Sequence, residues 1–228
     1  MKNRLTITFA ALSALTLAAC GQQAAEPAPK TEAATTEQAA APGQTPMAGQ
    51  PAPAFTLVDS EGTQRSLADF RGKTVILEWT NEGCPYVKKH YTGAMQALQR
   101  EAVADGVVWI TIISSAPGTQ GYVEGDAARE WRTRNNAASS YLLLDPTGEV
   151  GKRYGAQTTP DMRIIDAEGT LRFVGGIDDK PTNKVEDLEG ANNFVRAALT
   201  DLEAGRPVAT AFATPYGCAI KYPETVGT

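Results

Sequence analysis

Two short, almost continuously apolar segments constrain the fold of this chain more than any other feature. Residues 74–80 (TVILEWT) and 107–114 (VVWITIIS) are rich in β-branched and aromatic side chains. Such runs are typical of strands that are buried on both faces of a sheet. Between them, residues 85–104 place apolar side chains at helical spacing, which predicts a single helix.

Weaker patterns complete the expected element order. Turn residues and apolar periods predict a short strand, a short helical turn, a polar surface helix, a third core strand, a hairpin and a last amphipathic helix. The strand is expected at 55–59, the helical turn at 66–73, the surface helix at 124–137, the core strand at 141–145 and the hairpin at 162–175. The last helix is expected at 185–204, where Gly205 and Pro207 end it. The order predicts an α/β domain in which helices cover both faces of a mixed central sheet.

The bulk composition excludes several classes of protein. The chain has 228 residues, a net charge of −5, three cysteines and one histidine. An acidic chain lacks the basic surface that nucleic-acid binding requires. So few cysteines and histidines also exclude the usual zinc arrays. We therefore expect no nucleic-acid partner, no metal and no bound cofactor.

The N-terminus predicts export and a lipid anchor. Residues 1–19 combine a short basic start with an apolar run too short to span a membrane comfortably, as in a signal peptide. Residues 17–20 (LAAC) resemble the bacterial lipobox, in which Cys20 carries the lipid; an ordinary secretory signal with an incidental cysteine is the alternative. We expect a lipid-anchored protein that faces the periplasm of the bacterial cell envelope. Gly21, rather than aspartate, slightly favours the outer membrane.

Composition divides the remaining chain into three parts. Residues 20–50 are nearly all Ala, Gln, Pro, Thr, Glu and Gly, which predicts a disordered linker. Residues 51–206 form the predicted domain, and residues 207–228 form a tail that carries Cys218. In an oxidising periplasm, the two cysteines that remain beside Cys20 are candidates for a disulfide.

Cys84 stands at the start of the predicted helix, directly before Pro85. Unpaired N–H groups and the helix dipole favour a thiolate there, and the thiolate is the reactive form of cysteine. Proline suits the first helical turn because its missing N–H group is not needed. Lys88 and Lys89 either stabilise the thiolate further or solvate the surface. The bland alternative for Cys84 is a small buried hydrophobic residue.

Glu78 and His90 are the nearest titratable candidates. Glu78 lies on the central predicted strand, where a buried carboxyl group has a raised pKa and can relay protons to Cys84. An edge-exposed or salt-bridged glutamate is the alternative. His90, the sole histidine, lies six residues after Cys84, an offset that does not bring side chains together on a helix. We therefore expect His90 at the surface or acting only through another residue.

The segment EWTNEGCPYVKKHY resembles the thioredoxin superfamily, and more closely the peroxiredoxin-like branch of the redoxin (AhpC/TSA) family. The resemblance covers roughly residues 50–205 and implies a thioredoxin-like fold. It implies that Cys84 takes the place of the first cysteine of a Cys-x-x-Cys motif, with Val87 at the place of the second.

The same resemblance assigns roles to three further residues. Glu78 matches the buried acid that helps to move protons at the cysteines. Thr159 and Pro160, just before the predicted hairpin, match the cis-proline loop that faces the redox cysteine and pairs with substrate. A plain turn with a trans proline is the alternative for this loop.

The residues before Cys84 do not match those of true peroxiredoxins, which resemble Pro-x-x-x-Thr-x-x-Cys. Leu77 and Asn81 stand at the proline and threonine positions. Arg163 is a candidate for the arginine of that family, but nothing local in the sequence supports it. Direct peroxide reduction is therefore a weaker expectation than thiol–disulfide exchange.

Cys218 is the candidate for the missing second cysteine. The eleven residues from Val208 to Cys218 extend over about 36 Å, and the domain should be on the order of 30–40 Å across. The tail can therefore return to Cys84. Three hypotheses remain: a redox pair in which Cys84 attacks and Cys218 resolves, a structural disulfide, and an unrelated buried Cys218.

We therefore expect an oxidoreductase that acts on thiols and disulfides of proteins or small molecules, with peroxide as a further candidate substrate. The alternative is a catalytically silent thioredoxin-fold binding module with a structural disulfide between Cys84 and Cys218.

Overall fold

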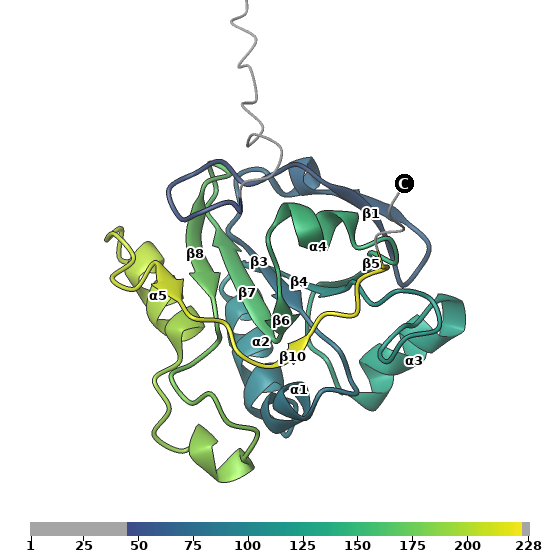
Figure 1. Ribbon diagram of the computed structural model, residues 1–228. Coiled ribbons are helices and arrows are strands. Elements are labelled where there is room, and N and C mark those ends of the chain that lie inside the picture. Colours follow the sequence, from purple (N-terminus) through teal and green to yellow (C-terminus); the bar gives the residue numbers. More distant parts are fainter. Residues whose placement is uncertain (1–44, 225–228) are drawn as a thin grey trace, which may run out of the picture. The chain divides into compact units, whose positions relative to one another are not determined.

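The computed structural model describes residues 45–224 (Figure 1). The predicted signal peptide, the lipidation site at Cys20 and most of the predicted linker lie outside the described residues. Within residues 45–224, no helix has the length and apolar character needed to cross a membrane.

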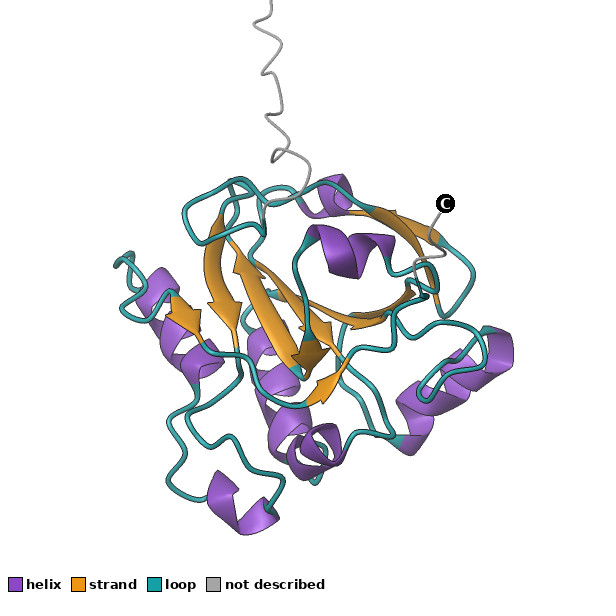
Figure 2. Ribbon diagram, in the orientation of Figure 1, coloured by secondary structure: helices purple, strands orange, loops and turns teal. Residues whose placement is uncertain are grey.

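The core of the fold is an eight-stranded mixed sheet with the strand order β2-β1-β5-β4-β3-β7-β8-β9 (Figures 1 and 2). The pairs β3–β4, β4–β5 and β8–β9 are parallel, and the other neighbours are antiparallel. A separate antiparallel pair joins β6 to β10. The strands are β1 Thr56–Asp59, β2 Gln64–Ser66, β3 Val75–Trp79, β4 Val108–Ile113, β5 Tyr141–Leu144, β6 Thr158–Thr159, β7 Asp161–Ile165, β8 Leu171–Gly175, β9 Phe212–Ala213 and β10 Cys218–Ala219.

Helices cover both faces of this sheet, as the sequence predicts (Figure 2). The α-helices are α1 Pro85–His90, α2 Ala94–Ala104, α3 Gly125–Arg134, α4 Glu149–Arg153 and α5 Phe194–Glu203, and the 3-10 helices are η1 Leu67–Phe70 and η2 Val185–Leu188.

Strand β3 lies at the centre because both of its faces are buried and, apart from Glu78, apolar. All five of its residues are buried. Ile76 belongs to the same core as Leu98 of α2, whereas Leu77 and Trp79 belong to the core that includes Tyr154 on the opposite face. A strand with helices on both sides cannot alternate between apolar and polar residues, which explains the continuous apolar run.

The prediction of one helix over 85–104 is wrong in its continuity. Helix α1 ends at His90 and α2 begins at Ala94. Gly93 between them has φ = 137°, which L-amino acids with a side chain rarely adopt. The apolar spacing continues across the break because both helices pack against the same face of the sheet.

The predicted helix over 185–204 is also interrupted. Only η2 and α5 form within it, and Gly190 lies between them with φ = 71°. The side chain of Asn193 then caps α5 by accepting a hydrogen bond from the backbone N–H of Arg196.

The ordered chain extends beyond both predicted domain limits. Before Pro51, the N–H of Gly49 donates to the carbonyl of Leu171 at 2.7 Å, and the N–H of Leu171 donates to the carbonyl of Gln50 at 2.9 Å. After α5, the tail adds β9 to the edge of the main sheet and β10 to β6. The tail therefore crosses the domain as part of the fold, as the yellow end of the ribbon shows (Figure 1).

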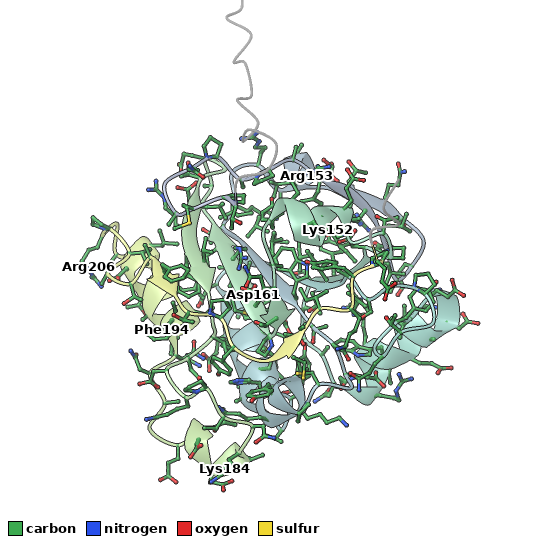
Figure 3. The ribbon with its side chains drawn as sticks, viewed as in Figure 1. Lys152, Arg153, Asp161, Lys184, Phe194 and Arg206 are labelled. Carbon is green, nitrogen blue, oxygen red and sulfur yellow. The ribbon has the colours of Figure 1, made fainter. Side chains whose placement is uncertain are left out.

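Close contacts fasten the tail on both sides of β10. Gly217 has φ = 135°, and a Cβ atom there would lie 2.0 Å from the carbonyl oxygen of Thr159. Beyond β10, the Tyr222 hydroxyl donates to the carbonyl of Ala156 at 2.8 Å. The ammonium group of Lys152, which is labelled in Figure 3, lies 5.5 Å from the centre of the Tyr222 ring.

Replacing Gly217 with alanine is expected to lift β10 off β6, because the added methyl group meets a backbone oxygen that cannot move aside. Gly93 is a matched control: its φ is nearly the same, but no atom lies within 4 Å of the added Cβ position. Gly93→Ala therefore measures the backbone cost alone, on the order of 1–3 kcal/mol. The measurement is the alkylation rate of Cys84 by peptide mapping, at about pH 9 so that the thiol is largely ionised. We expect a severalfold increase for Gly217→Ala only, and equal rates in the two variants would contradict the close contact.

Candidate functional site

Cys84 occupies the position that the sequence predicts, at the N-cap of α1 with Pro85 in the first turn. Its side chain is fully buried, at 0% relative exposure. Its sulfur atom lies 3.2 Å from the carbonyl oxygen of Thr159, to which the thiol donates a hydrogen bond. The helix start and β6 therefore place Cys84 between them.

Thr159 and Pro160 also lie where the resemblance implies. Thr159 ends β6, Pro160 leads directly into β7, and the peptide bond between them is cis. The carbonyl group of Thr159 faces Cys84. The predicted substrate contact of this loop is taken by the tail, because β10 pairs along β6.

Cys218 is brought to the same place by β10. In the register of the pair, Cys218 lies opposite Thr159. The thiol groups of Cys84 and Cys218 are free and hydrogen bond to each other. Cys218 is partly exposed, in contrast to the fully buried Cys84. The structure thus assembles two cysteines that are far apart in the sequence.

The two thiols differ in acidity. Burial alone would raise the pKa of Cys84, but hydrogen bonds from the Cys218 thiol and from the backbone of Val87 and Cys218 hold this pKa below its ordinary value of 9.0. Burial and the hydrogen bond to Cys84 raise the pKa of Cys218 to about 11. Cys84 therefore ionises first, and Cys218 keeps the proton that they share.

The two lysines after Cys84 have different environments. Lys88 is exposed, in agreement with a surface lysine. Lys89 is buried, so the surface interpretation is wrong for this residue. Its ammonium group donates to the carbonyl of Lys180 at 2.8 Å and lies 3.8 Å from the carboxylate of Asp178.

His90 is buried, so the surface alternative of its prediction is wrong, and the alternative that it acts only through another residue stays a prediction. Its Nε2 atom lies 3.2 Å from the hydroxyl of Tyr216, which donates a short hydrogen bond to Asp178. Burial lowers the pKa of His90 to about 4, against the opposing effect of the Asp178 charge, and the ring is neutral near neutral pH. Together with Lys89, these residues hold the tail at Tyr216, two residues before Cys218.

Asp178 and Tyr216 had no signal in the sequence that marked them as part of the site. Tyr216 also contacts the ring of Tyr86 on α1, with ring centres 5.9 Å apart. The tail is therefore tied to the same short helix that begins at Cys84.

Glu78 is fully buried on the face of β3 that α1 and α2 cover, so the exposed alternative is wrong. Burial raises the pKa of its carboxyl group above the ordinary value of 4.5, although hydrogen bonds oppose the shift. No hydrogen bond among the described residues joins this carboxyl group to Cys84. The donors to its two oxygens are the Tyr91 hydroxyl at 2.8 Å, Gln99 Nε2 at 2.9 Å, Trp109 Nε1 at 2.8 Å and the Thr111 hydroxyl at 3.3 Å.

The three residues that were compared with the peroxiredoxin motif, Leu77, Asn81 and Arg163, all make contacts that stabilise the fold. Leu77 lies in the core. The side chain of Asn81 accepts from the N–H of Gly83 at 2.8 Å and donates to the carbonyl of Gln120 at 2.9 Å, which fixes the loop before Cys84. Arg163 is buried and pairs with Asp161, which is labelled in Figure 3 at the start of β7. Its charge thus balances a buried carboxylate.

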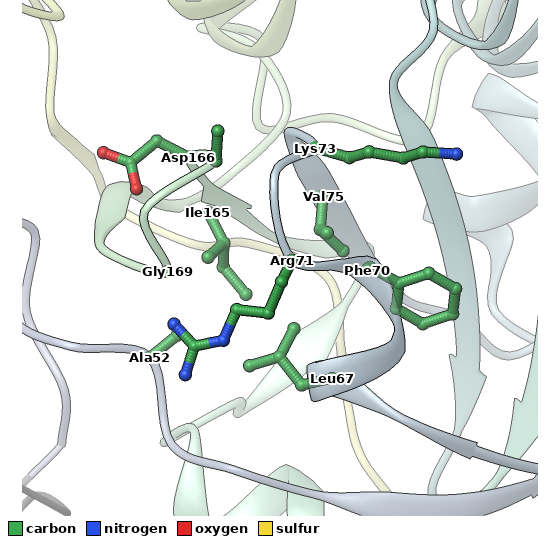
Figure 4. A pocket seen from close by; sticks show the side chains of 10 residues that line it. Ala52, Leu67, Phe70, Arg71, Lys73, Val75, Ile165, Asp166 and Gly169 are labelled. Carbon is green, nitrogen blue, oxygen red and sulfur yellow. The ribbon is translucent and has the colours of Figure 1, made fainter. Parts of the chain in front are cut away.

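The cavity at the opposite end of β3 offers no second site. It is lined by Val75, Ile165 and their neighbours and has a volume of about 20 Å³ (Figure 4). Such a cavity holds about one water molecule. Within residues 45–224, no three His, Cys, Asp or Glu side chains form a group that could hold a metal ion.

These features define a thioredoxin-like fold with a cysteine at the start of a helix and a proline loop facing it. The chain belongs to the AhpC/TSA family, whose profile matches residues 48–174. It is a thioredoxin-fold redox protein of this type. No curated protein matches the chain.

Solved structures with the same fold include two with a TM-score of 0.68 and 25% identity. One is an uncharacterized conserved protein from Geobacillus kaustophilus, covering 81% of this chain and 96% of that one. The other is a hypothetical protein from Sinorhizobium meliloti, covering 81% and 98%. An exposed lipoprotein thioredoxin from Streptococcus pneumoniae is 26% identical with a TM-score of 0.44, covering 53% and 87%. The predicted thioredoxin-like fold is confirmed.

The pKa of Cys84 is expected to depend on the thiol of Cys218. Cys218→Ala removes a hydrogen-bond donor while burial remains, so the pKa of Cys84 should rise. Cys218→Ser keeps a hydroxyl donor and should stay closer to the native protein. Ultraviolet titration of the thiolate, with Cys20 replaced by serine throughout, measures both. Equal values in the alanine and serine variants would show that this hydrogen bond does not set the pKa.

Glu78 is expected to make stability depend on pH. Burial raises the pKa of Glu78 in the folded state. Its contribution to the free energy of unfolding is therefore complete below the unfolded-state pKa of 4.5, and it is lost as the pH rises through the folded-state pKa. In Glu78→Gln, the Tyr91 hydroxyl can turn to accept from the new amide. The free energy of unfolding of the native protein should therefore fall relative to that of Glu78→Gln as the pH rises above about 4.5. Denaturant titrations from acidic to mildly basic pH test this, and parallel curves would refute it.

Proposed function

We propose that this protein is a thiol–disulfide oxidoreductase in which Cys84 and Cys218 form a reversible disulfide. The observation that carries the proposal is the hydrogen bond between the two free thiols, one of which has a lowered pKa. In the reduced protein no covalent bond joins the tail to Cys84, so Cys84 is the nucleophile when the tail opens, and Cys218 is the resolving cysteine that the tail supplies in place of Val87. Oxidation of the pair passes two electrons and two protons to a disulfide substrate, which becomes two thiols.

Thr159 and Pro160 support this pair by holding the tail. The backbone of Thr159 lies opposite Cys218 in the β6–β10 pair and also accepts from Cys84. One backbone residue therefore contacts both sulfur-bearing residues. This arrangement favours a disulfide within the protein as the resting oxidised product.

Glu78 is proposed as a proton reservoir rather than a direct partner of Cys84. Its raised pKa allows it to take up a proton when the sulfur atoms lose theirs. The Tyr91 hydroxyl, which donates to Glu78, lies at the end of the short helix that begins at Cys84. Transfer from there to the sulfur requires a bridging water.

Thiols and disulfides are favoured over peroxide as substrates. Asn81 stands at the position of the threonine in the motif of true peroxiredoxins. Its side chain makes hydrogen bonds that hold the loop before Cys84. Peroxide reduction therefore takes second place in this proposal.

We also propose a location in the bacterial cell envelope, through a lipid on Cys20. Support comes from the signal-like residues 1–19 and the lipobox-like residues 17–20. The outer membrane remains slightly favoured by Gly21.

Alkylation of the purified protein before and after mild reduction, followed by peptide mapping, tests the proposed function. We expect Cys84 and Cys218 to be joined after oxidation and to separate in a modest thiol buffer. Turnover of a model disulfide should be lost in both Cys84→Ser and Cys218→Ser and retained in Cys20→Ser. A bond that resists reduction would instead support the silent module with a structural disulfide. Free thiols in oxidised protein would refute the pair.

A further inference from the structure

We propose that a reducing thiol enters the oxidised protein at Cys218 and not at Cys84, an inference that rests on the proposed disulfide. Cys84 would then be the sulfur that leaves when the bond opens. The argument depends on access, on the way the tail is held and on the chemistry of the two sulfur atoms.

Access to the two sulfur atoms is unequal. Cys84 has 0% relative exposure and lies beneath Thr159 and the tail, whereas Cys218 is partly exposed. A thiolate attacks a disulfide along the line of the S–S bond, from the side opposite the leaving sulfur. Attack on Cys84 would have to come from within the packed domain, but attack on Cys218 comes from the solvent side of the tail.

The tail is held on both sides of Cys218, which keeps Cys84 covered. On one side, Tyr216 donates to the buried carboxylate of Asp178. On the other side, the N–H of Ile220 donates to the carbonyl of Gln157 at 3.0 Å. Opening a path to Cys84 would break these contacts, whereas attack on Cys218 breaks none of them.

Further along the tail, the carbonyl of Lys221 accepts from the N–H of Ala116 at 2.8 Å, which ties this segment to the loop after β4. The positive charge of Lys221 also acts on Cys218 and favours its ionised form. The same charge favours the approach of an anionic thiolate to the exposed sulfur.

The chemistry of the pair agrees with this direction. An incoming thiolate forms a bond to the sulfur of Cys218 while the S–S bond breaks, and the electron pair of that bond leaves on Cys84 as its thiolate. The sulfur with the lower pKa is the better leaving group, and that sulfur is Cys84. A second thiol of the reductant then attacks the reductant's sulfur atom in the mixed disulfide. Cys218 leaves and takes the proton of that second thiol. Two reductant thiols become one disulfide, and the protein regains two thiols.

The test is a short pulse of glutathione on the full oxidised chain carrying Cys20→Ser, stopped with acid and followed by peptide mapping. We expect glutathione on Cys218 and a free thiol on Cys84. Glutathione predominantly on Cys84, with Cys218 free, would overturn the inference while leaving the proposed disulfide intact. If no disulfide forms in the oxidised protein, the proposed function fails and the inference fails with it.

Two variants make the result specific. Gly217→Ala, which is expected to displace β10, should shift part of the glutathione to Cys84. Lys221→Gln should keep the adduct on Cys218 but slow its formation severalfold with anionic mercaptoacetate, and much less with neutral mercaptoethanol. An adduct on Cys84 in the native protein that Gly217→Ala does not increase would show that the tail does not control access.

Discussion

The pairing of β10 with β6 is the contact on which the rest of the site depends. It places Cys218 opposite Thr159, and Thr159 in turn contacts Cys84. The same pairing covers Cys84 and brings in Cys218, whose hydrogen bonds are among those that oppose the effect of burial on the pKa of Cys84. A pair of two-residue strands is weak by itself. The hydrogen bonds of Tyr216 and Tyr222, on the two sides of β10, therefore help to hold β10 against β6.

The proposed use of Cys218 as the second cysteine changes what the short helix must do. In a Cys-x-x-Cys motif, one helical turn presents both sulfur atoms. Here Val87 is free to pack into the core, and its backbone N–H supports the Cys84 sulfur. The relative position of the two cysteines is then set by the tail across α1, β6 and α4, so it responds to anything that moves the tail.

The sequence was sufficient for the central sheet and for the position of Cys84. Continuous apolar runs mark β3 and β4 because both faces are covered, and a cysteine before proline marks a helix start. The break at Gly93 is not predictable from the apolar spacing, because that spacing continues through it. The cluster of Lys89, His90, Asp178 and Tyr216 could not be predicted, because its members are polar and pair across long sequence distances with no local pattern.

The long sequence separation between Cys84 and β10 has a consequence for biosynthesis. Cys84 leaves the ribosome long before Cys218, and until the tail docks it lacks the hydrogen bonds that Cys218 contributes. Folding of the domain through β8 therefore does not by itself assemble the pair of thiols. The two cysteines come together only after β10 has been made and has paired with β6.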